Sequence, residues 1–285
     1  MFISSRLIKG LLILVAGFCL LGPAHGQSNA ITIASFNIQV FGEKKMENPE
    51  VVDVLVQIIK RYDIVAVQEI RNKSGQAIKD LERIIDAMGD NYDVIVGPRL
   101  GRTKSKEQYA FIYRVNTITP IGKPYTYVET GQDIIHREPL IARFNAMDDF
   151  DFILINSHVD KDDVVGELGV FPAIVEDVRN KFPHEKDIVI LGDLNTDCTY
   201  FDESQYIEIR NPNLYEWLIT DQMDTNVADN ECTYDRIIVS KEMYEHFTNV
   251  AGVLRFDQLY SFQVPPKEVS DHYPVYAEFN SECKE

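Results

Sequence analysis

The sequence has few cysteines, no surplus of positive charge and no long hydrophobic run beyond its first residues. Only 4 of its 285 residues are cysteines, which excludes a small scaffold built on disulfides. A chain of this length can instead bury a substantial hydrophobic core. No tandem repeat, low-complexity tract or linker interrupts residues 30–280, which favours one domain over two.

Basic side chains are outnumbered. The chain has 28 Lys and Arg against 45 Asp and Glu, a formal net charge of −17. Such an acidic protein is not a general binder of polyanions. If it acts on nucleic acid, metal ions and a local basic patch must offset the repulsion between the acidic protein and the phosphates. Its binding of nucleic acid should then be weak and sensitive to salt.

The first 26 residues have the pattern of a secretory signal peptide. Arg6 and Lys9 precede or border the apolar run GLLILVAGFCLLG, and AHG precedes Gln27. The run is short for a membrane span, so an anchored N-terminal helix is the less favoured alternative. We expect cleavage after Gly26, leaving a mature single domain over 27–285 that is secreted or periplasmic and has no membrane anchor.

Three cysteines remain after the expected cleavage: Cys198, Cys232 and Cys283. Export permits a disulfide. Cys198 follows the motif GDLNT and Cys232 precedes TYDR, so both flank informative residues. We predict a Cys198–Cys232 bridge and a free Cys283.

Predicted strands and helices are interleaved along the chain. A helix is expected within 47–62, with Asn48 as its N-cap and Pro49 in its first turn, and further helices at 76–88 and 164–181. Several predicted strands follow one another without a helix between them, which favours an α/β sandwich with mixed sheets. Strands are expected at 31–38, 63–70, 92–97, 109–114, 140–144, 151–159, 188–191, 235–240 and 272–279.

Several of these apolar strands end in polar, ionisable residues. The set comprises Asn37, Glu69, His158, Asp193 and Asn195, with Asp271 and His272 just before the last strand. One such residue alone is most often a turn-former, but packed strands can gather their ends at one rim. An oxygen-rich cluster without cysteine suits a hard cation such as Mg²⁺ or Ca²⁺, and two histidines beside it suit acid–base chemistry on a phosphate.

An EF-hand is the rival interpretation of the segment that begins at Asp193. Asp193, Asn195 and Asp197 match the first three ligand positions of that loop. Cys198 stands where the loop requires glycine, and Ser204 stands where the bidentate glutamate belongs. The EF-hand is therefore excluded.

Taken together, these segments make the chain resemble pancreatic-type deoxyribonuclease I, within the endonuclease/exonuclease/phosphatase superfamily. The resemblance implies a four-layered sandwich of two packed mixed sheets flanked by helices, and metal-dependent hydrolysis of phosphodiester bonds. The matching segments are IASFNIQVFGEKKM, RYDIVAVQEIR, LGRTKSKEQYAFIYR, REP, NSHV, GDLNTDC, CTYDRIIVS and SDHYP, in the family's order over nearly the whole mature chain.

The resemblance also implies roles for single residues. Glu69 would bind the metal, supported by Asn37 and Asp271; Asp193 and Asn195 would handle the phosphate, and Asp193 is also a candidate ligand of a second ion. His158 would pair with Glu107, and His272 with Asp235. We assign His272–Asp235 as the base and His158–Glu107 as the acid, which yields 5′-phosphate ends; the reverse assignment stays open.

Contacts to substrate and structural ions follow from the same resemblance. Arg71 would enter the minor groove, and Arg137 would contact a phosphate or serve as a structural salt-bridge partner. Gln39 and Ser105 replace an arginine and a tyrosine that contact DNA. Arg102, Lys104 and Lys106 form either a basic edge or a solvated loop. One structural Ca²⁺ loop retains only Asp133, and a second site is partly retained near Asp224, Asn226 and Asn230.

We therefore predict a secreted, monomeric endonuclease that uses Mg²⁺ or Mn²⁺ and cleaves DNA with little sequence preference. The alternative is a phosphatase or phospholipase of the same superfamily that acts on lipid or inositol phosphates, including activity like that of related toxin subunits. A non-enzymatic binding protein is disfavoured, because the complete set of strand-end residues and their carboxylate partners is present.

Overall fold

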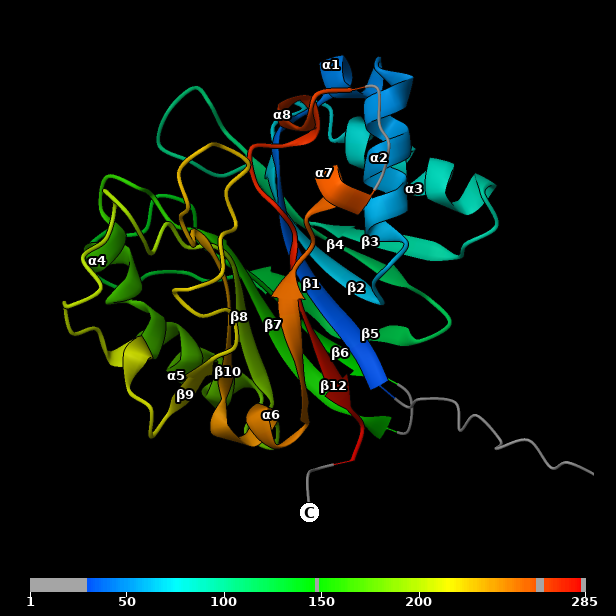
Figure 1. The fold of residues 1–285 in the computed structure, drawn as a ribbon. Coiled ribbons are helices and arrows are strands. Elements are labelled where there is room, and N and C mark those ends of the chain that lie inside the picture. Colours follow the sequence, from blue (N-terminus) through cyan, green and yellow to red (C-terminus); the bar gives the residue numbers. More distant parts are fainter. Residues whose placement is uncertain (1–29, 147–148, 260–263, 283–285) are drawn as a thin grey trace, which may run out of the picture.

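Two six-stranded sheets packed face to face form the centre of the protein, and helices cover their outer surfaces (Figure 1). The computed structural model describes residues 30–146, 149–259 and 264–282. The predicted signal peptide, 1–26, and Cys283 lie outside the described residues. No helix among the described residues is long and apolar enough to cross a membrane.

The elements alternate along the chain as the interleaved pattern predicts. The strands are β1 Ala30–Phe41, β2 Ile64–Ile70, β3 Tyr92–Val96, β4 Gln108–Arg114, β5 Ile118–Thr126, β6 Leu140–Ala146, β7 Asp151–His158, β8 Ile188–Asp193, β9 Tyr215–Trp217, β10 Asp235–Ser240, β11 Phe247–Val253 and β12 Val275–Asn280. The helices are α1 Glu43–Met46, α2 Pro49–Ile59, α3 Gln76–Ala87, α4 Val164–Leu168, α5 Phe171–Lys181, α6 Lys241–Glu245, α7 Phe256–Leu259 and α8 Pro266–Val269, with a 3₁₀ helix at Glu208–Arg210.

Both sheets are mixed, which confirms the predicted fold class. Their strand orders are β11-β12-β1-β2-β4-β3 and β5-β6-β7-β8-β10-β9. Each sheet contains one parallel pair near its centre, β1 with β2 and β7 with β8, and its other pairs are antiparallel. Because the carboxyl ends of a parallel pair lie on the same side, four central strands deliver their last residues to one edge of the sandwich.

The core has three apolar layers, as four layers of secondary structure require. Alternating residues of β1 show the division, since Ile33 points between the sheets while Ala34 and Phe36 pack under the helices. α2 and α3 cover the sheet that contains β1. α4 and α5 cover the other sheet, as Figure 1 also shows.

The structure confirms the predicted start of the helix within 47–62 and contradicts the helix predicted over 164–181. The side chain of Asn48 accepts hydrogen bonds from the backbone N–H groups of Glu50 and Val51, and α2 begins at Pro49 as predicted. The single helix predicted over 164–181 is wrong, because the chain forms α4 and α5 with Gly169 and Val170 between them. Pro172, in the first turn of α5, lacks the N–H that would continue the hydrogen-bond ladder of α4.

The predicted Cys198–Cys232 disulfide is confirmed, with its Cα atoms 5.9 Å apart. It joins the loop that follows β8 to the segment that leads into β10. Both segments carry polar side chains at the same edge of the sandwich, so the bridge fixes their spacing.

Gly192 determines how closely β7 and β8 approach each other just before Asp193. Its φ is +147°, and a Cβ atom there would lie 1.7 Å from the carbonyl oxygen of Ser157. We predict that Gly192→Ala lowers the free energy of unfolding by about 2–5 kcal/mol through overpacking and backbone strain. Urea denaturation would measure the loss.

Gly131→Ala is the matched control, because Gly131 also has a positive φ, +114°, but no heavy atom lies within 4 Å of the position that a Cβ atom would take. Gly131→Ala should lower the free energy of unfolding by only about 1 kcal/mol, because it introduces backbone strain without a steric clash. Equal losses for the two variants would contradict the steric explanation.

Candidate active site

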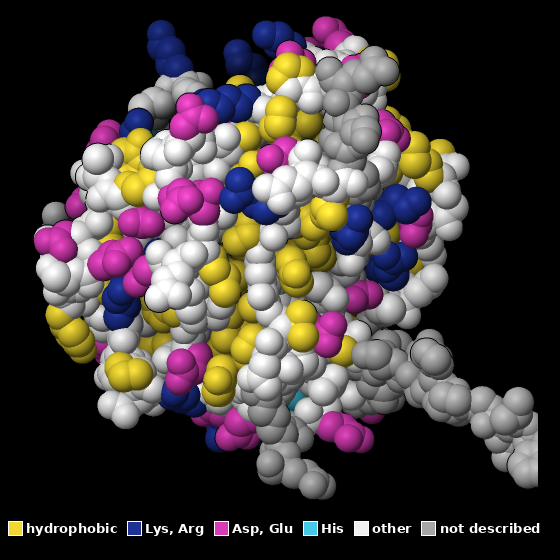
Figure 2. Space-filling model, in the orientation of Figure 1, with side chains coloured by type: hydrophobic (Ala, Val, Ile, Leu, Met, Phe, Trp, Pro, Cys, Tyr) yellow, Lys and Arg dark blue, Asp and Glu magenta, His cyan; other side chains and the backbone are white. Residues whose placement is uncertain are grey.

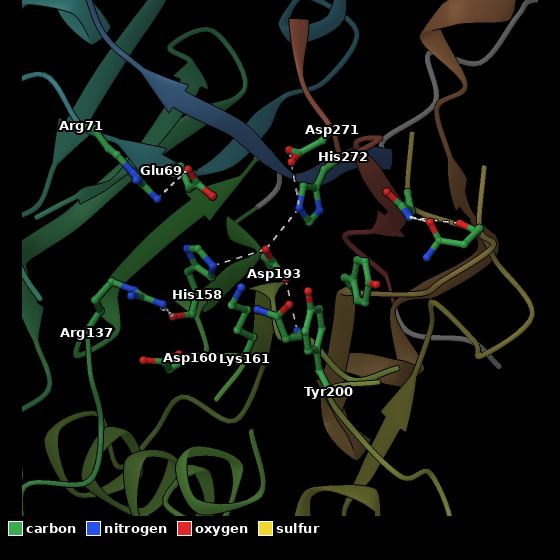
Figure 3. Close-up of a pocket in the computed structure, with 14 residues that line it drawn as sticks. Glu69, Arg71, Arg137, His158, Asp160, Lys161, Asp193, Tyr200, Asp271 and His272 are labelled. Atoms are coloured by element: carbon green, nitrogen blue, oxygen red, sulfur yellow. Dashed lines mark hydrogen bonds and ion pairs between the residues drawn. The ribbon is translucent and has the colours of Figure 1, made fainter. Parts of the chain in front are cut away.

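The strand-end residues predicted from the sequence lie together at one edge of the sandwich. Figure 3 shows Glu69, His158, Asp193 and His272 directed into a common pocket. The pocket is lined by Glu69, Arg71, Arg137, His158, Asp160, Lys161, Asp193, Asn195, Tyr200, Asn226, Asn230, Tyr234, Asp271 and His272. Asn37, Glu107 and Asp235 are buried behind these side chains and support them.

Asp193 is the centre of this arrangement. Its Oδ2 atom accepts a hydrogen bond from Nδ2 of Asn37 at 2.9 Å. The same oxygen lies 3.4 Å from Nε2 of His158 and 3.5 Å from Nε2 of His272. One carboxylate therefore contacts both imidazoles, and both imidazoles face the same small volume.

Each histidine has a second carboxylate on its opposite ring nitrogen. His158 Nδ1 lies 2.9 Å from Glu107 Oε1, and His272 Nδ1 lies 2.7 Å from Asp235 Oδ2. A buried carboxylate at Nδ1 orients the ring and leaves Nε2 directed toward the pocket.

The carboxylates also shift the histidine pKa values. Burial by itself lowers the pKa of His272, but Asp235 and Asp193 raise that pKa well above its usual value. Glu107 and Asp193 likewise outweigh burial and raise the pKa of His158. Burial opposes the charge of Glu107, yet His158, Arg137 and Arg71 together lower the Glu107 pKa to about 2. The site thus favours charged imidazoles when no other cation is near.

The backbone at the edge is bent so that these side chains reach the pocket. Glu69 has φ +60° and Asn195 has φ +51°, a region that few non-glycine residues adopt. The register of β2 shifts against both neighbours close to Glu69, and such bulges redirect side chains. Asn195 is held by a hydrogen bond from its Nδ2 to the carbonyl of Val159 at 2.9 Å. Strain of this kind is concentrated at functional sites.

The residues predicted to bind a metal fit a hard cation in their donor chemistry. Glu69 and Asp271 line the pocket with Asp193, and Oδ1 of Asp271 is buried yet accepts no hydrogen bond from any described residue. Asn37 directs its amide nitrogen toward Glu69 and Asp193, so it joins the two carboxylates. Ligand atoms of Asp193, Asp235 and His272 also lie within 4.8 Å of one another, although Asp235 is fully buried behind the imidazole.

The two arginines predicted to contact substrate are engaged by carboxylates in this structure. Arg71 lies 3.0 Å from Glu69 Oε2 and donates a hydrogen bond to the Ser105 hydroxyl at 3.0 Å. Arg137 lies 2.5 Å from Glu107 Oε1 and also donates to the carbonyl of His158. Both side chains line the pocket, and each holds a carboxylate of the site in place.

Two of the residues predicted near structural calcium sites, Asp133 and Asp224, are paired with arginines, whereas Asn226 donates hydrogen bonds to Asn230. Asp133 lies 3.0 Å from Arg102, which belongs to the predicted basic edge. Asp224 lies 3.0 Å from Arg255. A guanidinium therefore supplies the positive charge beside each of these two carboxylates.

Six pocket residues were not predicted as part of the active site: Asp160, Lys161, Tyr200, Asn226, Asn230 and Tyr234. Tyr234 stacks at an angle between Tyr200 and His272, with ring centroids 5.4 and 6.0 Å away. For Asp160, Lys161, Tyr200 and Tyr234 the only sequence signal is their closeness to the motifs NSHV, GDLNTDC and CTYDR, whereas Asn226 and Asn230 were predicted only near a structural Ca²⁺ site.

Glu167 supports the wall of the pocket from beneath. Its buried carboxylate accepts hydrogen bonds from the backbone N–H groups of His136 at 2.8 Å and Asp160 at 3.2 Å. These residues adjoin Arg137 and Lys161. Burial raises the pKa of Glu167 to about 7, against the opposing effect of the two N–H groups and Arg137.

Comparisons with known proteins agree with this geometry. Residues 34–272 match the sequence model of the endonuclease/exonuclease/phosphatase family. Deoxyribonuclease-1 of Bos taurus is 32% identical over 280 residues, which cover 94% of this chain and 96% of that protein. Deoxyribonuclease-1 of Homo sapiens is 34% identical over 258 residues, which cover 86% of this chain and 91% of that protein.

Solved structures share the fold at lower identity. A mannosyl-6-phosphatase of Bacteroides thetaiotaomicron superposes with a TM-score of 0.59 at 18% identity, covering 87% of this chain and 98% of that chain. An endonuclease/exonuclease/phosphatase family protein of the same organism gives a TM-score of 0.60 at 19% identity, covering 88% and 98%. At such identities the likeness shows the fold alone.

The raised pKa of Glu167 predicts a pH-dependent stability. The native state holds this proton up to about pH 7, whereas the ordinary carboxyl pKa is 4.5. Between these values the native state binds more protons than the unfolded state, so rising pH removes stability, by about 3 kcal/mol for this group. Glu167→Gln has no such proton to lose.

Urea midpoints of the native protein and Glu167→Gln, measured from pH 5 to pH 7.5, would check this. The difference in unfolding free energy should move in favour of the variant as the pH rises. A difference that stays constant over this range would show that Glu167 is already ionised at pH 5.

Proposed function

Since the chain belongs to the endonuclease/exonuclease/phosphatase family, in its deoxyribonuclease I branch, we propose that it is a secreted, divalent-metal-dependent DNA endonuclease. It hydrolyses phosphodiester bonds with little sequence preference and leaves 5′-phosphate ends. The relatives place the chain among hydrolases that act as nucleases or phosphodiesterases. The observation that carries the proposal is the Asp193 carboxylate between two histidines, each backed by its own buried carboxylate.

Two opposed histidines suit the two proton transfers of phosphodiester hydrolysis. A water loses a proton as it attacks phosphorus, and the departing 3′-oxygen gains one. His272, oriented by Asp235, accepts the proton of the water at Nε2 in its neutral form. A cation held by the neighbouring carboxylates would offset the negative charge that raises the His272 pKa and would favour that form. His158, oriented by Glu107, donates a proton from Nε2 to the leaving oxygen. The raised pKa of His158 keeps that proton in place until it is needed.

The remaining residues bind the phosphate and neutralise charge. Glu69 and Asp271 would hold the metal ion, with Asp193 and Asn37 beside them. When bound, a divalent cation such as Mg²⁺ or Mn²⁺ stabilises the charge that develops on the phosphate. Asn195 offers an amide to the phosphate oxygens, and Arg137 orients Glu107 while it faces the pocket.

Binding of DNA is expected to be weak and dependent on salt. Acidic and basic side chains are intermixed on the face drawn in Figure 2 rather than separated by sign, and the whole chain has a net charge of −17. Arg71 contributes a guanidinium at the rim, with 34% of its side chain exposed. The small number of available cations limits the electrostatic part of the affinity.

Secretion is part of the same proposal. Residues 1–26 have a signal-peptide pattern, and the Cys198–Cys232 bridge is typical of an oxidising compartment. We propose that the mature domain, 27–285, acts as a soluble monomer in the periplasm or medium.

Replacing either histidine tests the proposed chemistry. We predict that His158→Ala and His272→Ala each reduce plasmid nicking by about 100-fold or more, because one proton transfer loses its catalyst. His184→Ala is the control, since His184 is exposed and outside the pocket. Retained nicking by either pocket variant, folded according to circular dichroism, would rule out the assigned roles.

Metal removal and substrate choice test the rest of the proposal. A chelator should abolish nicking of plasmid DNA, and added Mg²⁺ or Mn²⁺ should restore it, because the carboxylates of Glu69 and Asp271 would otherwise repel the phosphate. Assays on plasmid DNA and on phosphoinositides, run side by side, distinguish the nuclease from the lipid phosphatase alternative. Faster turnover of the phosphoinositides would favour the alternative.

A further inference from the structure

Lys161 differs from the other basic side chains of the pocket. Three Lys and Arg residues line it: Arg71, Arg137 and Lys161. Arg71 is paired with Glu69 and Arg137 with Glu107. Lys161 forms no ion pair within the described part of the chain, and its ammonium group lies near the Tyr200 ring, whose centroid is 5.7 Å from Nζ.

The backbone that carries Lys161 is fixed although its side chain is exposed. The carboxylate of the preceding residue, Asp160, lies 2.6 Å from Nδ1 of His136 and also accepts the backbone N–H of Asp162. The N–H of Asp160 is bound by Glu167. In Figure 3 the side chain of Lys161 rises beside Asp160 on the pocket wall, between His158 and Tyr200.

We propose that Lys161 binds a phosphate of the substrate strand next to the one that is cleaved. This inference rests on the proposed function and specifies how the site recognises a polynucleotide. The scissile phosphate belongs beside Asp193 and the two histidines. Because a nucleic-acid strand carries a charge at every nucleotide, a strand that crosses the pocket brings a second phosphate to its wall. A flexible lysine binds such a phosphate as a point charge.

Because the pocket is rich in carboxylates, this single lysine provides a large share of the electrostatic attraction for the substrate strand. Four carboxylates line the pocket, those of Glu69, Asp160, Asp193 and Asp271. The arginines must exchange a carboxylate partner for a phosphate, whereas Lys161 has none among the described residues to give up. A substrate with only one phosphate gains nothing from Lys161, so the residue selects for a polymer.

Kinetics on two substrates test the inference. Duplex DNA offers neighbouring phosphates, and bis(4-nitrophenyl) phosphate is a diester with a single one. We expect Lys161→Ala to raise KM for duplex DNA about 3- to 10-fold in 50 mM salt, with kcat unchanged. The gap should shrink by about 3-fold between 50 and 200 mM salt, as expected for one lost phosphate contact. Hydrolysis of the small diester should not change.

Two further variants separate charge from structure. Lys161→Arg keeps the charge and should retain a KM close to that of the native protein. Lys123→Ala removes another exposed lysine, on β5 and outside the pocket, and should leave both KM and salt dependence unchanged.

The outcomes distinguish the inference from the proposed function. If the native protein nicks DNA and Lys161→Ala does so with the same KM and salt dependence, the inference on Lys161 fails alone. Equal losses on DNA and on the small diester would place Lys161 at the reacting phosphate and also overturn it. If the native protein cleaves the small diester but not DNA, the proposed function and the inference both fail.

Discussion

The contact of Asp193 with both sheets is the interaction on which the site depends. Its carboxylate binds Asn37 of β1 in one sheet while the residue itself ends β8 in the other. Beneath it, Gln68 of β2 donates to Asn156 of β7 at 2.7 Å across the apolar interface. A buried polar contact is costly unless both partners meet. These two contacts therefore fix the relative position of the sheets at the edge where the histidines converge.

The strength of the strand signal decided how much of the fold could be predicted. Strands such as β2 and β8 are buried on both faces and begin with four consecutive apolar residues, so they were predicted. β5, β9 and β11 were not predicted, because they lie at sheet edges and mix polar residues, proline or glycine into their runs. Their pairing comes from neighbouring strands rather than from their own pattern.

The sequence predicted those residues of the site that lie within recognisable motifs. His158, Asp193 and His272 end or precede strands within recognisable segments, and the sheet topology brings them together. Lys161 and Tyr200 lie in loops, and nothing in their local sequence shows that the two loops meet. Arg102 illustrates another limit, because its pairing with Asp133 depends on two loops 31 residues apart in sequence. Sequence patterns therefore identify which side chains belong to the site. They reveal which residues these side chains contact only where the motifs also imply the order of the strands.

The pairing of cations with carboxylates explains how an acidic protein can keep such a site ordered. Arg71 and Arg137 neutralise Glu69 and Glu107, which otherwise would repel one another and Asp193 at close range. The histidines are thereby positioned before substrate arrives, and such preorganisation lowers the cost of reaching the transition state. The same pairing leaves little positive charge free for DNA. A site built in this way favours accurate placement of the scissile phosphate over tight binding of the strand.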